Sequence, residues 1–321
     1  MSNKVVTITL NPALDLTGSL DVLNLGSVSL AKRSSLHAAG KGVNVARVLR
    51  DLGADVTVTG FLGQDNQEMF CQLFDQLGVH DQFIRVEGAT RINVKLVEKS
   101  GAVSDINFPG VNVTSQDIGH FETTLFELAQ SHDFFVLAGS LPKGISAELC
   151  ASWIRKLNDM GKKVIFDSSR EALSAGIAAQ PWLIKPNDEE LSFLVNKPLA
   201  SIDEITVAAL QASNHIENVV VSLGEKGVLW HNNGQWLHAS PPSMQVVSTV
   251  GAGDTLVAGL CWGQMQEMSK PRTLSLATAL SALAVEQVGV GIHDLEAVHQ
   301  LQQKIRVISL ATPVEIEKDK G

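Results

Sequence analysis

The chain has 321 residues, 45% of them hydrophobic and 18% charged, so it can bury a large core and is not a disordered protein. Lys and Arg total 25 against 34 Asp and Glu, a formal charge of −9, which excludes the basic surface of a protein that binds nucleic acid or anionic lipid. Any phosphate group that the chain binds must therefore be held by a local set of donors.

The N-terminal segment contains one Lys and a six-residue run of apolar residues and Thr. This run is too short for a signal-peptide core and far below the roughly 20 residues of a membrane span, so we expect a cytoplasmic protein with no membrane partner. The three cysteines, Cys71, Cys150 and Cys261, are widely spaced with no His or Cys close by. That spacing does not suggest a zinc site, and we expect buried thiols.

Short β-branched runs alternate with helix-period stretches along the chain. We predict strands at 5–10, 56–63, 134–142, 163–169, 182–187 and 219–224, and helices at 45–53, 148–161 and 206–213. This alternation is typical of a mostly parallel sheet with helices on both faces. We therefore expect one domain over 1–321, with a solvated tail at 314–321.

Two segments break this alternation. Residues 11–36 and 85–110 contain alternating strand patterns with Gly turns and no helix between them. They predict a small separate β-sheet, formed from both segments, that acts as a lid.

Several predicted strands end in polar or glycine residues. The four ends are Gly139-Ser140, 167–169, 185–187 and 222–224. Each end alone is compatible with ordinary loop chemistry. Because ligands in open α/β sheets bind beyond the carboxyl ends of the strands, the four together favour a shared cleft.

A glycine pair, Gly40 and Gly42, begins the first predicted helix, with Lys41 between them and Asn44 in the first turn. A phosphate-binding P-loop is excluded, because its Lys must be followed by Ser or Thr. A dinucleotide fingerprint needs a strand directly before the glycines, and the preceding residues, 34–39, are a poor strand by pattern.

A second glycine turn precedes Asp254, which stands directly after Gly251, Ala252 and Gly253 and before an apolar run. Unpaired N–H groups at the start of a helix form an anion site. Asp254 alone could be a helix-start acid worth roughly 0.3–1 kcal/mol. That role does not explain two preceding glycines, so we favour amides that hold a transferring phosphoryl group and a carboxylate that accepts the proton of the attacking hydroxyl. The direction in which the pKa of Asp254 shifts stays open at this point.

The motif AAGKGVNVA at 38–46, with Gly53 and Gly63 at the expected spacings, resembles the N-terminal signature of the PfkB (ribokinase-like) carbohydrate kinases, and STVGAGD at 248–254 resembles their C-terminal signature. TLNPALD, TRINVK, GSLP, FDSSREAL, KPNDEEL and SLGEKG resemble segments of the sugar-phosphate branch of that family. The resemblance implies a ribokinase-like three-layer α/β sandwich with a small β-sheet lid. It also implies an enzyme that uses ATP and Mg²⁺ to phosphorylate fructose 1-phosphate at its 6-hydroxyl, and a homodimer that pairs through the lid.

The resemblance assigns a role to each candidate residue. Asp254 is the base, and Gly251, Ala252 and Gly253 form the anion hole. The sugar-phosphate side is expected to comprise Asp15, Gly40, Lys41, Asn44, Arg91, Asn93 and Ser140. The ATP side is expected to comprise Lys185, Asn187, Ser222 and Gly224, with Glu190 acting indirectly on Mg²⁺. Without the resemblance, Glu190 would be a first-turn helix acid, Lys185 a surface base and Arg91 a solvated strand residue.

Two departures and three alternatives accompany this assignment. Ser248 stands where many sugar kinases have Asp, which puts a monovalent-cation site in doubt, and Asp105 stands where the fructose-6-phosphate enzyme uses a base. Tagatose 6-phosphate or fructose 6-phosphate are alternative acceptors. A non-catalytic sugar-phosphate sensor or regulator-binding protein is an alternative of another class, and a nicotinamide oxidoreductase comes third.

Overall fold

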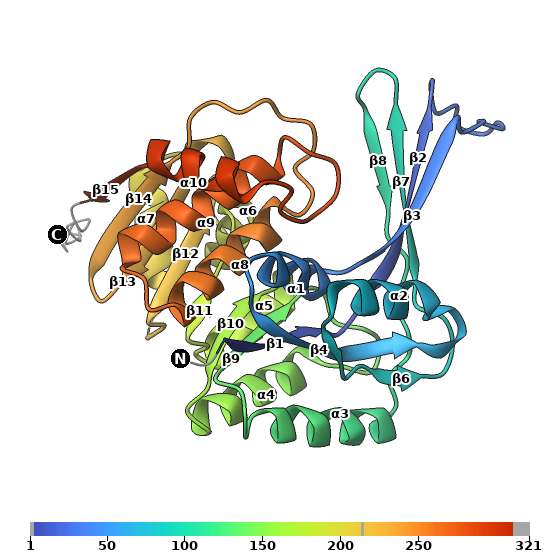
Figure 1. The fold of residues 1–321 in the computed structure, drawn as a ribbon, viewed down its shortest axis with the longest axis horizontal. Helices are drawn as coiled ribbons and strands as arrows, with labels where there is room; N and C mark the ends of the chain where they lie inside the picture. The colour runs from blue at the N-terminus through green and yellow to red at the C-terminus, as the bar shows by residue number, and fades with distance from the viewer. Residues whose placement is uncertain (1–2, 213–214, 311–321) are drawn as a thin grey trace, which may run out of the picture.

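The computed structural model describes residues 3–212 and 215–310. Within them the main sheet runs in the order β15-β14-β13-β12-β11-β10-β9-β1-β4-β5, with β6 also paired to β4 (Figure 1). The pairs from β12 through β4 are parallel, and β13, β14 and β15 add an antiparallel edge. The mostly parallel sheet expected from the alternating pattern is confirmed.

The strands of the main sheet are β1 Lys4–Thr9, β4 Asp55–Gly63, β5 His80–Asp81, β6 Ile84–Val86, β9 Phe134–Ala138, β10 Lys163–Asp167, β11 Leu183–Ile184, β12 Asn218–Ser222, β13 Val228–Asn232, β14 Gln235–Ser240 and β15 Arg306–Leu310. The helices are α1 Lys41–Asp51, α2 Glu68–Leu77, α3 Ser115–Leu128, α4 Ala147–Asp159, α5 Arg170–Ala178, α6 Asp188–Val195, α7 Ile202–Ala212, α8 Ala252–Met265, α9 Lys270–Ala284 and α10 Leu295–Lys304. Each predicted strand and helix has its counterpart among them, although position 213 of the last predicted helix lies outside the described residues.

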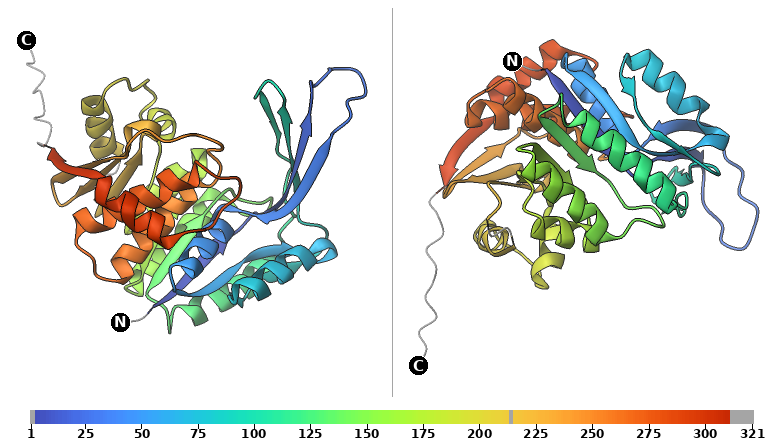
Figure 2. Two further views of the ribbon diagram at one scale, coloured as in Figure 1. Left: turned by 45° about the horizontal axis from the view of Figure 1, so that its top comes forward. Right: turned by 90° about the horizontal axis from the view of Figure 1, so that it is seen from below.

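Helices cover both faces of the main sheet (Figure 2). One core layer holds α1, α2, α8, α9 and α10, and the other holds α3, α4, α5, α6 and α7. Successive side chains of a strand point to opposite faces, so Val5 lies in the first core and Val6 in the second. The strands therefore read as continuous apolar runs, since both faces are buried.

A second, four-stranded sheet stands off the main body (Figure 2). Its order is β3-β2-β7-β8, from β2 Ala13–Leu20, β3 Arg33–Ala39, β7 Ile92–Glu98 and β8 Val103–Ile106. A separate sheet is present: β2, β7 and β8 lie within the segments 11–36 and 85–110, and β3 extends past position 36 to Ala39. The prediction that residues 34–39 are a poor strand was wrong, because pairing with β2 stabilises a strand whose own side chains are mostly exposed.

Helix α8 is buried on all sides: Asp254 through Cys261 are all buried, since α9 packs against its outer side and the sheet against its inner side. One further expectation needed correction. Cys150 and Cys261 are buried as expected, whereas Cys71 is only half-buried and its Sγ accepts a hydrogen bond from Arg85 Nη2 at 3.5 Å.

Among the helices of the described residues, none combines the length and apolarity that crossing a bilayer requires. The tail expected at 314–321 lies outside the described residues.

Candidate active site

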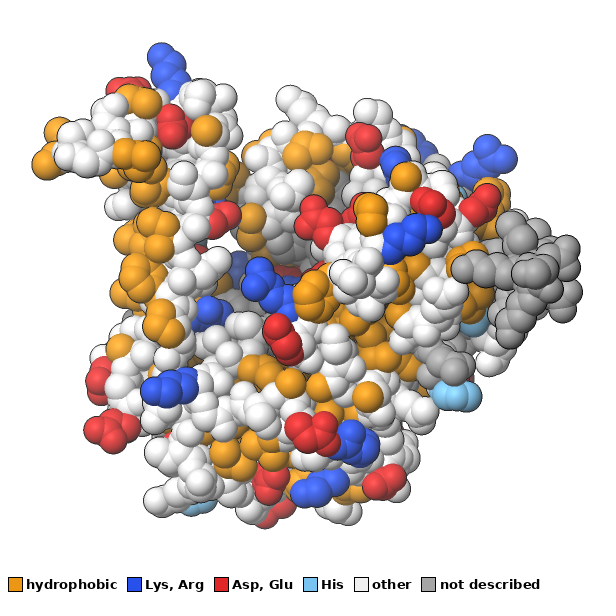
Figure 3. Space-filling view, turned by 180° about the vertical axis from the view of Figure 1, so that it is seen from behind, with side chains coloured by type: hydrophobic (Ala, Val, Ile, Leu, Met, Phe, Trp, Pro, Cys, Tyr) orange, Lys and Arg blue, Asp and Glu red, His pale blue; other side chains and the backbone are white. Residues whose placement is uncertain are grey.

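A cavity of about 1320 Å³ opens at the carboxyl ends of the central strands (Figure 3). Its lining follows the sheet order, from Ser222 at the end of β12, through Lys185 after β11 and Ser168 after β10, to Ser140 after β9. Five neighbouring strands, from β12 to β1, span about 19 Å at the usual spacing. The cleft is therefore long enough to hold two ligands end to end.

The structure brings every candidate residue from the sequence into this one cavity. Its lining includes Asp15, Gly40, Lys41, Asn44, Arg91, Asn93, Ser140, Lys185, Asn187, Glu190, Ser222, Gly224, Gly251, Ala252, Gly253 and Asp254. The four polar strand ends meet there, as the carboxyl-edge rule predicts for a parallel sheet.

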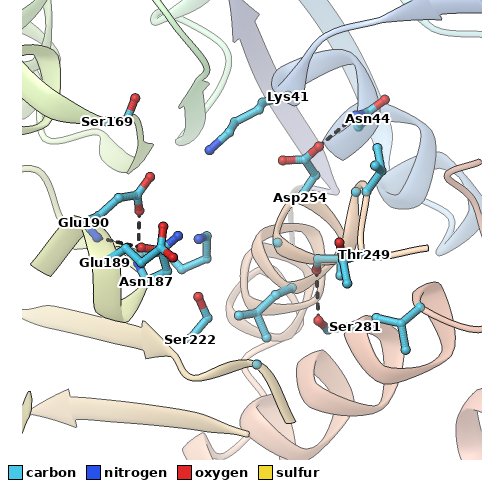
Figure 4. A pocket seen from close by; sticks show the side chains of 18 of the residues that line it. Lys41, Asn44, Ser169, Asn187, Glu189, Glu190, Ser222, Thr249, Asp254 and Ser281 are labelled. Carbon is cyan, nitrogen blue, oxygen red and sulfur yellow. Dashed lines mark hydrogen bonds between the residues drawn. The ribbon is translucent and has the colours of Figure 1, made fainter. Parts of the chain in front are cut away.

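Asp254 lies at the middle of the cavity and is only 6% exposed. Asn44 Nδ2, from α1, donates to Asp254 Oδ2 at 2.7 Å (Figure 4). Burial raises the pKa of Asp254 from its ordinary 3.8 to about 6, against the opposing effects of Lys41, the Asn44 hydrogen bond and Lys185. The carboxylate is thus a stronger base than a solvated aspartate and stays ionised at neutral pH. Asn44, expected on the sugar-phosphate side, directly contacts this carboxylate.

Asp167 is a site residue that the sequence-based assignment missed. It is fully buried at the end of β10, where Lys41 Nζ lies 3.2 Å from Oδ2 and Lys185 Nζ lies 3.5 Å from Oδ1. Burial opposes ionisation of Asp167, but the two ammonium groups outweigh it and lower its pKa. Its position at the end of a predicted strand is the sequence signal that could have identified it.

Lys41 and Lys185 place two positive charges beside the base. Lys41 extends from the first turn of α1 into the cavity (Figure 4), and its pKa is raised because Asp167, Asp254 and Glu190 outweigh the effect of burial. Lys185 is 4% exposed, so it is not a surface base. A Cβ atom on Gly253 would lie only 3.6 Å from Lys185 Nζ, so the ammonium group sits against the start of α8. Two fixed positive charges of this kind can stabilise the negative charge on a phosphoryl group while it is transferred.

Helix α8 begins at Gly251, which has φ +81° and leaves the helix without a side-chain cap. Ser281 Oγ from α9 donates to the Ala252 carbonyl at 2.9 Å (Figure 4), which fixes the first turn from behind. The uncapped N–H groups face the cavity and carry partial positive charge. This is the anion site expected from the glycine turn.

Helix α1 also begins in the cavity without a side-chain cap, at Gly40 with φ +144°. A Cβ atom on Gly42 would lie 2.4 Å from Thr9 Oγ1, and one on Gly40 would lie 2.8 Å from Thr9 Cγ2. The glycine pair therefore lets α1 start directly against the end of β1. The two glycines are needed first for this close packing. Because the helix starts so close to β1, its first backbone N–H groups face the cavity.

At the β1 end of the cavity, Asp15 accepts a hydrogen bond from Asn93 Nδ2 at 3.2 Å. Burial raises the pKa of Asp15, opposed by the Asn93 hydrogen bond. Arg91 is not a solvated strand residue: it donates to the carbonyls of Pro12, Phe108 and Asn11 and, at 3.3 Å, to Ser140 Oγ. These bonds use four of the five N–H groups of the guanidinium, so Arg91 anchors the second sheet and keeps one donor free.

At the β12 end, Asn187 and Glu190 form a capping box at the start of α6. Glu190 N donates to Asn187 Oδ1 at 2.7 Å, and Asn187 N donates to Glu190 Oε2 at 3.0 Å (Figure 4). The pair is thus a helix cap as well as part of the cavity wall, alongside Ser222 and Gly224. Apolar side chains complete this end: Pro241, Pro242, Met244, Val246 and Val285.

The described residues contain no group of three or more His, Cys, Asp or Glu side chains that could hold a metal ion on its own. Mg²⁺ in phosphoryl-transfer sites is held by one or two carboxylates together with substrate phosphates, so the site fits that ion without a protein cage. Glu190 lines the cavity, and its Oε1 takes no part in the capping box. Asp105, noted as a departure, pairs with Lys95 Nζ at 2.7 Å on the second sheet.

The chain is similar to known carbohydrate kinases. The family model described as pfkB family carbohydrate kinase matches residues 5–297. The chain is 68% identical to a 1-phosphofructokinase of Vibrio cholerae, covering 97% of this chain and 98% of the relative. It is 51% identical to a 1-phosphofructokinase of Escherichia coli, covering 92% and 95%. A solved structure of phosphofructokinase-2 from Escherichia coli, in complex with substrates and products, aligns with a TM-score of 0.85 at 27% identity, covering 94% and 99%.

Proposed function

The chain belongs to the pfkB family of carbohydrate kinases, and from that premise we propose that it transfers the γ-phosphoryl group of ATP to the 6-hydroxyl of D-fructose 1-phosphate. The products are fructose 1,6-bisphosphate and ADP. The observation that carries this proposal is the buried carboxylate of Asp254 beside an uncapped helix start and two lysines, in a cleft with a polar end and an apolar end. We also propose that the reaction takes place in the cytoplasm.

Asp254 accepts the proton of the attacking hydroxyl as the new P–O bond forms. Its carboxylate is ionised above about pH 6 and is held toward the cavity by Asn44. The hydroxyl proton ends on Asp254, and the electron pair of the broken P–O bond leaves with ADP. Base catalysis of this kind contributes about 10²- to 10⁴-fold.

The N–H groups of Gly251, Ala252 and Gly253 hold the charge that spreads over the transferring phosphoryl group. Lys185, beside Gly253, and Lys41 add positive charge, and Asp167 keeps both ammonium groups apart and oriented. Glu190 would help to hold Mg²⁺, which would neutralise part of the charge on the phosphates of ATP.

The two substrates occupy opposite ends of the cleft in this proposal. The sugar phosphate lies at the β1 end, where Asp15 and Asn93 meet its hydroxyl groups and Arg91, Ser140 and Gly40 lie near its phosphate end. ATP lies at the β12 end, where Asn187, Ser222 and Gly224 meet its phosphates. The apolar side chains at that end pack against its base. This order follows the strand order and leaves the reacting atoms beside Asp254.

The second sheet acts as a lid over the sugar end and, in this proposal, as the contact between two copies in a homodimer. Its strands and the segment that follows β8 expose Ile92, Val103, Ile106 and Phe108 at 41–52% (Figure 3). Exposed apolar side chains on a thin sheet are unfavourable in a monomer, so a partner sheet that covers them stabilises both copies. The closed lid excludes water from the phosphoryl group.

The proposal is tested by measuring ADP release from ATP and Mg²⁺ with fructose 1-phosphate, fructose 6-phosphate and tagatose 6-phosphate separately. We expect the highest kcat/KM with fructose 1-phosphate, and phosphorus NMR of the product identifies the bisphosphate. An equal or higher kcat/KM with fructose 6-phosphate or tagatose 6-phosphate would refute fructose 1-phosphate as the acceptor. Tight sugar-phosphate binding without ADP release would instead indicate a sensor.

The assignment of the two ends is tested by a matched pair of variants. Asp15→Asn should raise the KM for the sugar phosphate by about 10-fold or more and leave the KM for ATP within about twofold. Asp21→Asn, an acid with a 60% exposed side chain just beyond the end of the same strand, is the control and should change neither. A rise in the KM for ATP alone would contradict the order of the two substrates.

A further inference from the structure

Three polar residues lie along one face of α1 and reach the elements around the anion site. Asn44, Arg47 and Asp51 are three and four positions apart, the spacing of one helix face. Asn44 contacts the carboxylate of Asp254. Arg47 Nη1 donates to the Val290 carbonyl at 3.1 Å, and Asp51 Oδ2 accepts from Ile292 N at 2.8 Å.

The two distal contacts seat the loop between α9 and α10 on helix α1. Gly291 lies between them: a Cβ atom there would be 3.3 Å from both Arg47 Cδ and Asp51 Oδ2, and φ is +134°. Gln287 Nε2 closes the loop by donating to the Gly291 carbonyl at 2.8 Å. The loop is therefore held in one position by one cation, one carboxylate and its own internal bond.

The held loop presses one side chain against the start of α8. A Cβ atom on Gly251 would lie 2.4 Å from Val290 Cγ2, so this methyl group packs directly on the Gly251 backbone. Gly251 has a left-handed backbone conformation and directly precedes the first turn of α8, whose amides face the cavity. Val290 does not line the cavity and therefore acts from behind the anion site.

From these contacts we infer that Arg47 and Asp51 are positioning residues that set the geometry of the anion site by holding Val290 against Gly251. One rigid helix then carries both the residue that orients the base and the residues that seat the anion site, so the distance between base and phosphoryl group is set by α1. This inference rests on the proposed phosphoryl transfer. A misplacement of about 1 Å in such a site costs up to about 10²-fold in rate.

The first test compares Arg47→Met with Arg50→Met. Arg50 is on the same helix, is half-buried and also bonds backbone carbonyls, those of Leu77 and Ala54, away from the cavity. We expect Arg47→Met to lower kcat about 10- to 100-fold with the KM for sugar phosphate changed less than about threefold. Arg50→Met should lose similar thermal stability and keep kcat within about twofold.

Rescue distinguishes positioning from a general loss of packing. Arg47→Lys keeps a cation that can donate to the Val290 carbonyl, so it should recover most of the kcat lost in Arg47→Met. Equal kcat in Arg47→Met and Arg50→Met at matched thermal stability, or no recovery in Arg47→Lys, overturns the inference.

A second pair tests the contact itself. Val290→Ala removes the methyl group against Gly251, whereas Val288→Ala, two positions earlier and 81% exposed in the wild type, does not. We expect hydrogen exchange of the segment 249–256 to become faster in Val290→Ala and Arg47→Met and to stay unchanged in Val288→Ala and Arg50→Met. Exchange needs no turnover, so this result stands or fails separately from the proposed acceptor. Unchanged exchange in all four variants overturns the inference.

Discussion

Replacing Asp254 with Asn should make the protein more stable while it removes most of the activity. Burial raises the pKa of Asp254 from 3.8 to about 6, which means that the folded state binds a proton more tightly at this site than the unfolded chain does. The carboxylate is therefore a source of instability above about pH 6. Asn has a similar shape and no charge, so the penalty disappears in the variant.

The size of the effect follows from the two pKa values. Each pKa unit between the folded and unfolded states corresponds to about 1.4 kcal/mol, so the difference at neutral pH amounts to about 3 kcal/mol. A chain of 321 residues has an unfolding entropy for which 1 kcal/mol shifts Tm by about 1.5 °C. We expect Asp254→Asn to raise Tm by about 4–5 °C at pH 8 and to lower kcat by at least about 10²-fold.

The sign of the pH dependence separates this explanation from simple repacking. Because the folded-state pKa lies above the unfolded one, the site favours folding below pH 4 and that contribution is lost as pH rises through 6. The Tm difference between the variant and the wild type should therefore shrink to near zero below pH 4. Glu189 is an exposed acid in the same cavity, so Glu189→Gln is the control. Its free energy of unfolding should stay within about 0.5 kcal/mol of the wild-type value. A variant that is less stable at pH 8, or a Tm difference that ignores pH, refutes the reasoning.

Three further predictions concern the charge, the turn and the second sheet. Lys41→Met removes a charge that lowers the pKa of Asp254, so the acid limb of the kcat–pH profile should move to higher pH; a shift to lower pH would contradict the coupling. Gly251→Ala should cost at least about 1 kcal/mol more unfolding free energy than Gly234→Ala, because both have φ near +80° but only Gly251 has a methyl group 2.4 Å from the added Cβ; equal losses would rule out that clash. If the proposed dimer forms, Ile106→Lys should convert it to a monomer in analytical ultracentrifugation, and an unchanged sedimentation coefficient would exclude the second sheet as the contact.

Much of the fold could be predicted because its signals are local. The β-branched runs indicate strands that are buried on both faces, and the helix-period stretches indicate helices that are buried on one face. Both patterns are visible within a window of about 10 residues. The two glycine turns are local for the same reason: Gly40 and Gly251 have backbone conformations that few other residues adopt. Residues 34–39 show the limit of such signals, since their strand exists only because β2 pairs with them.

The sequence by itself determined the central parallel strands, where polar residues end them, and which carboxylate follows an uncapped helix start. Only the tertiary structure decided that Asp167 lies between two lysines and that the pKa of Asp254 rises. It also decided that the Arg91 guanidinium donates mainly to backbone carbonyls. Asn44 and Asp254, 210 positions apart, meet at 2.7 Å. Desolvation and Coulomb energies depend on such through-space distances, and no local pattern in a chain encodes them.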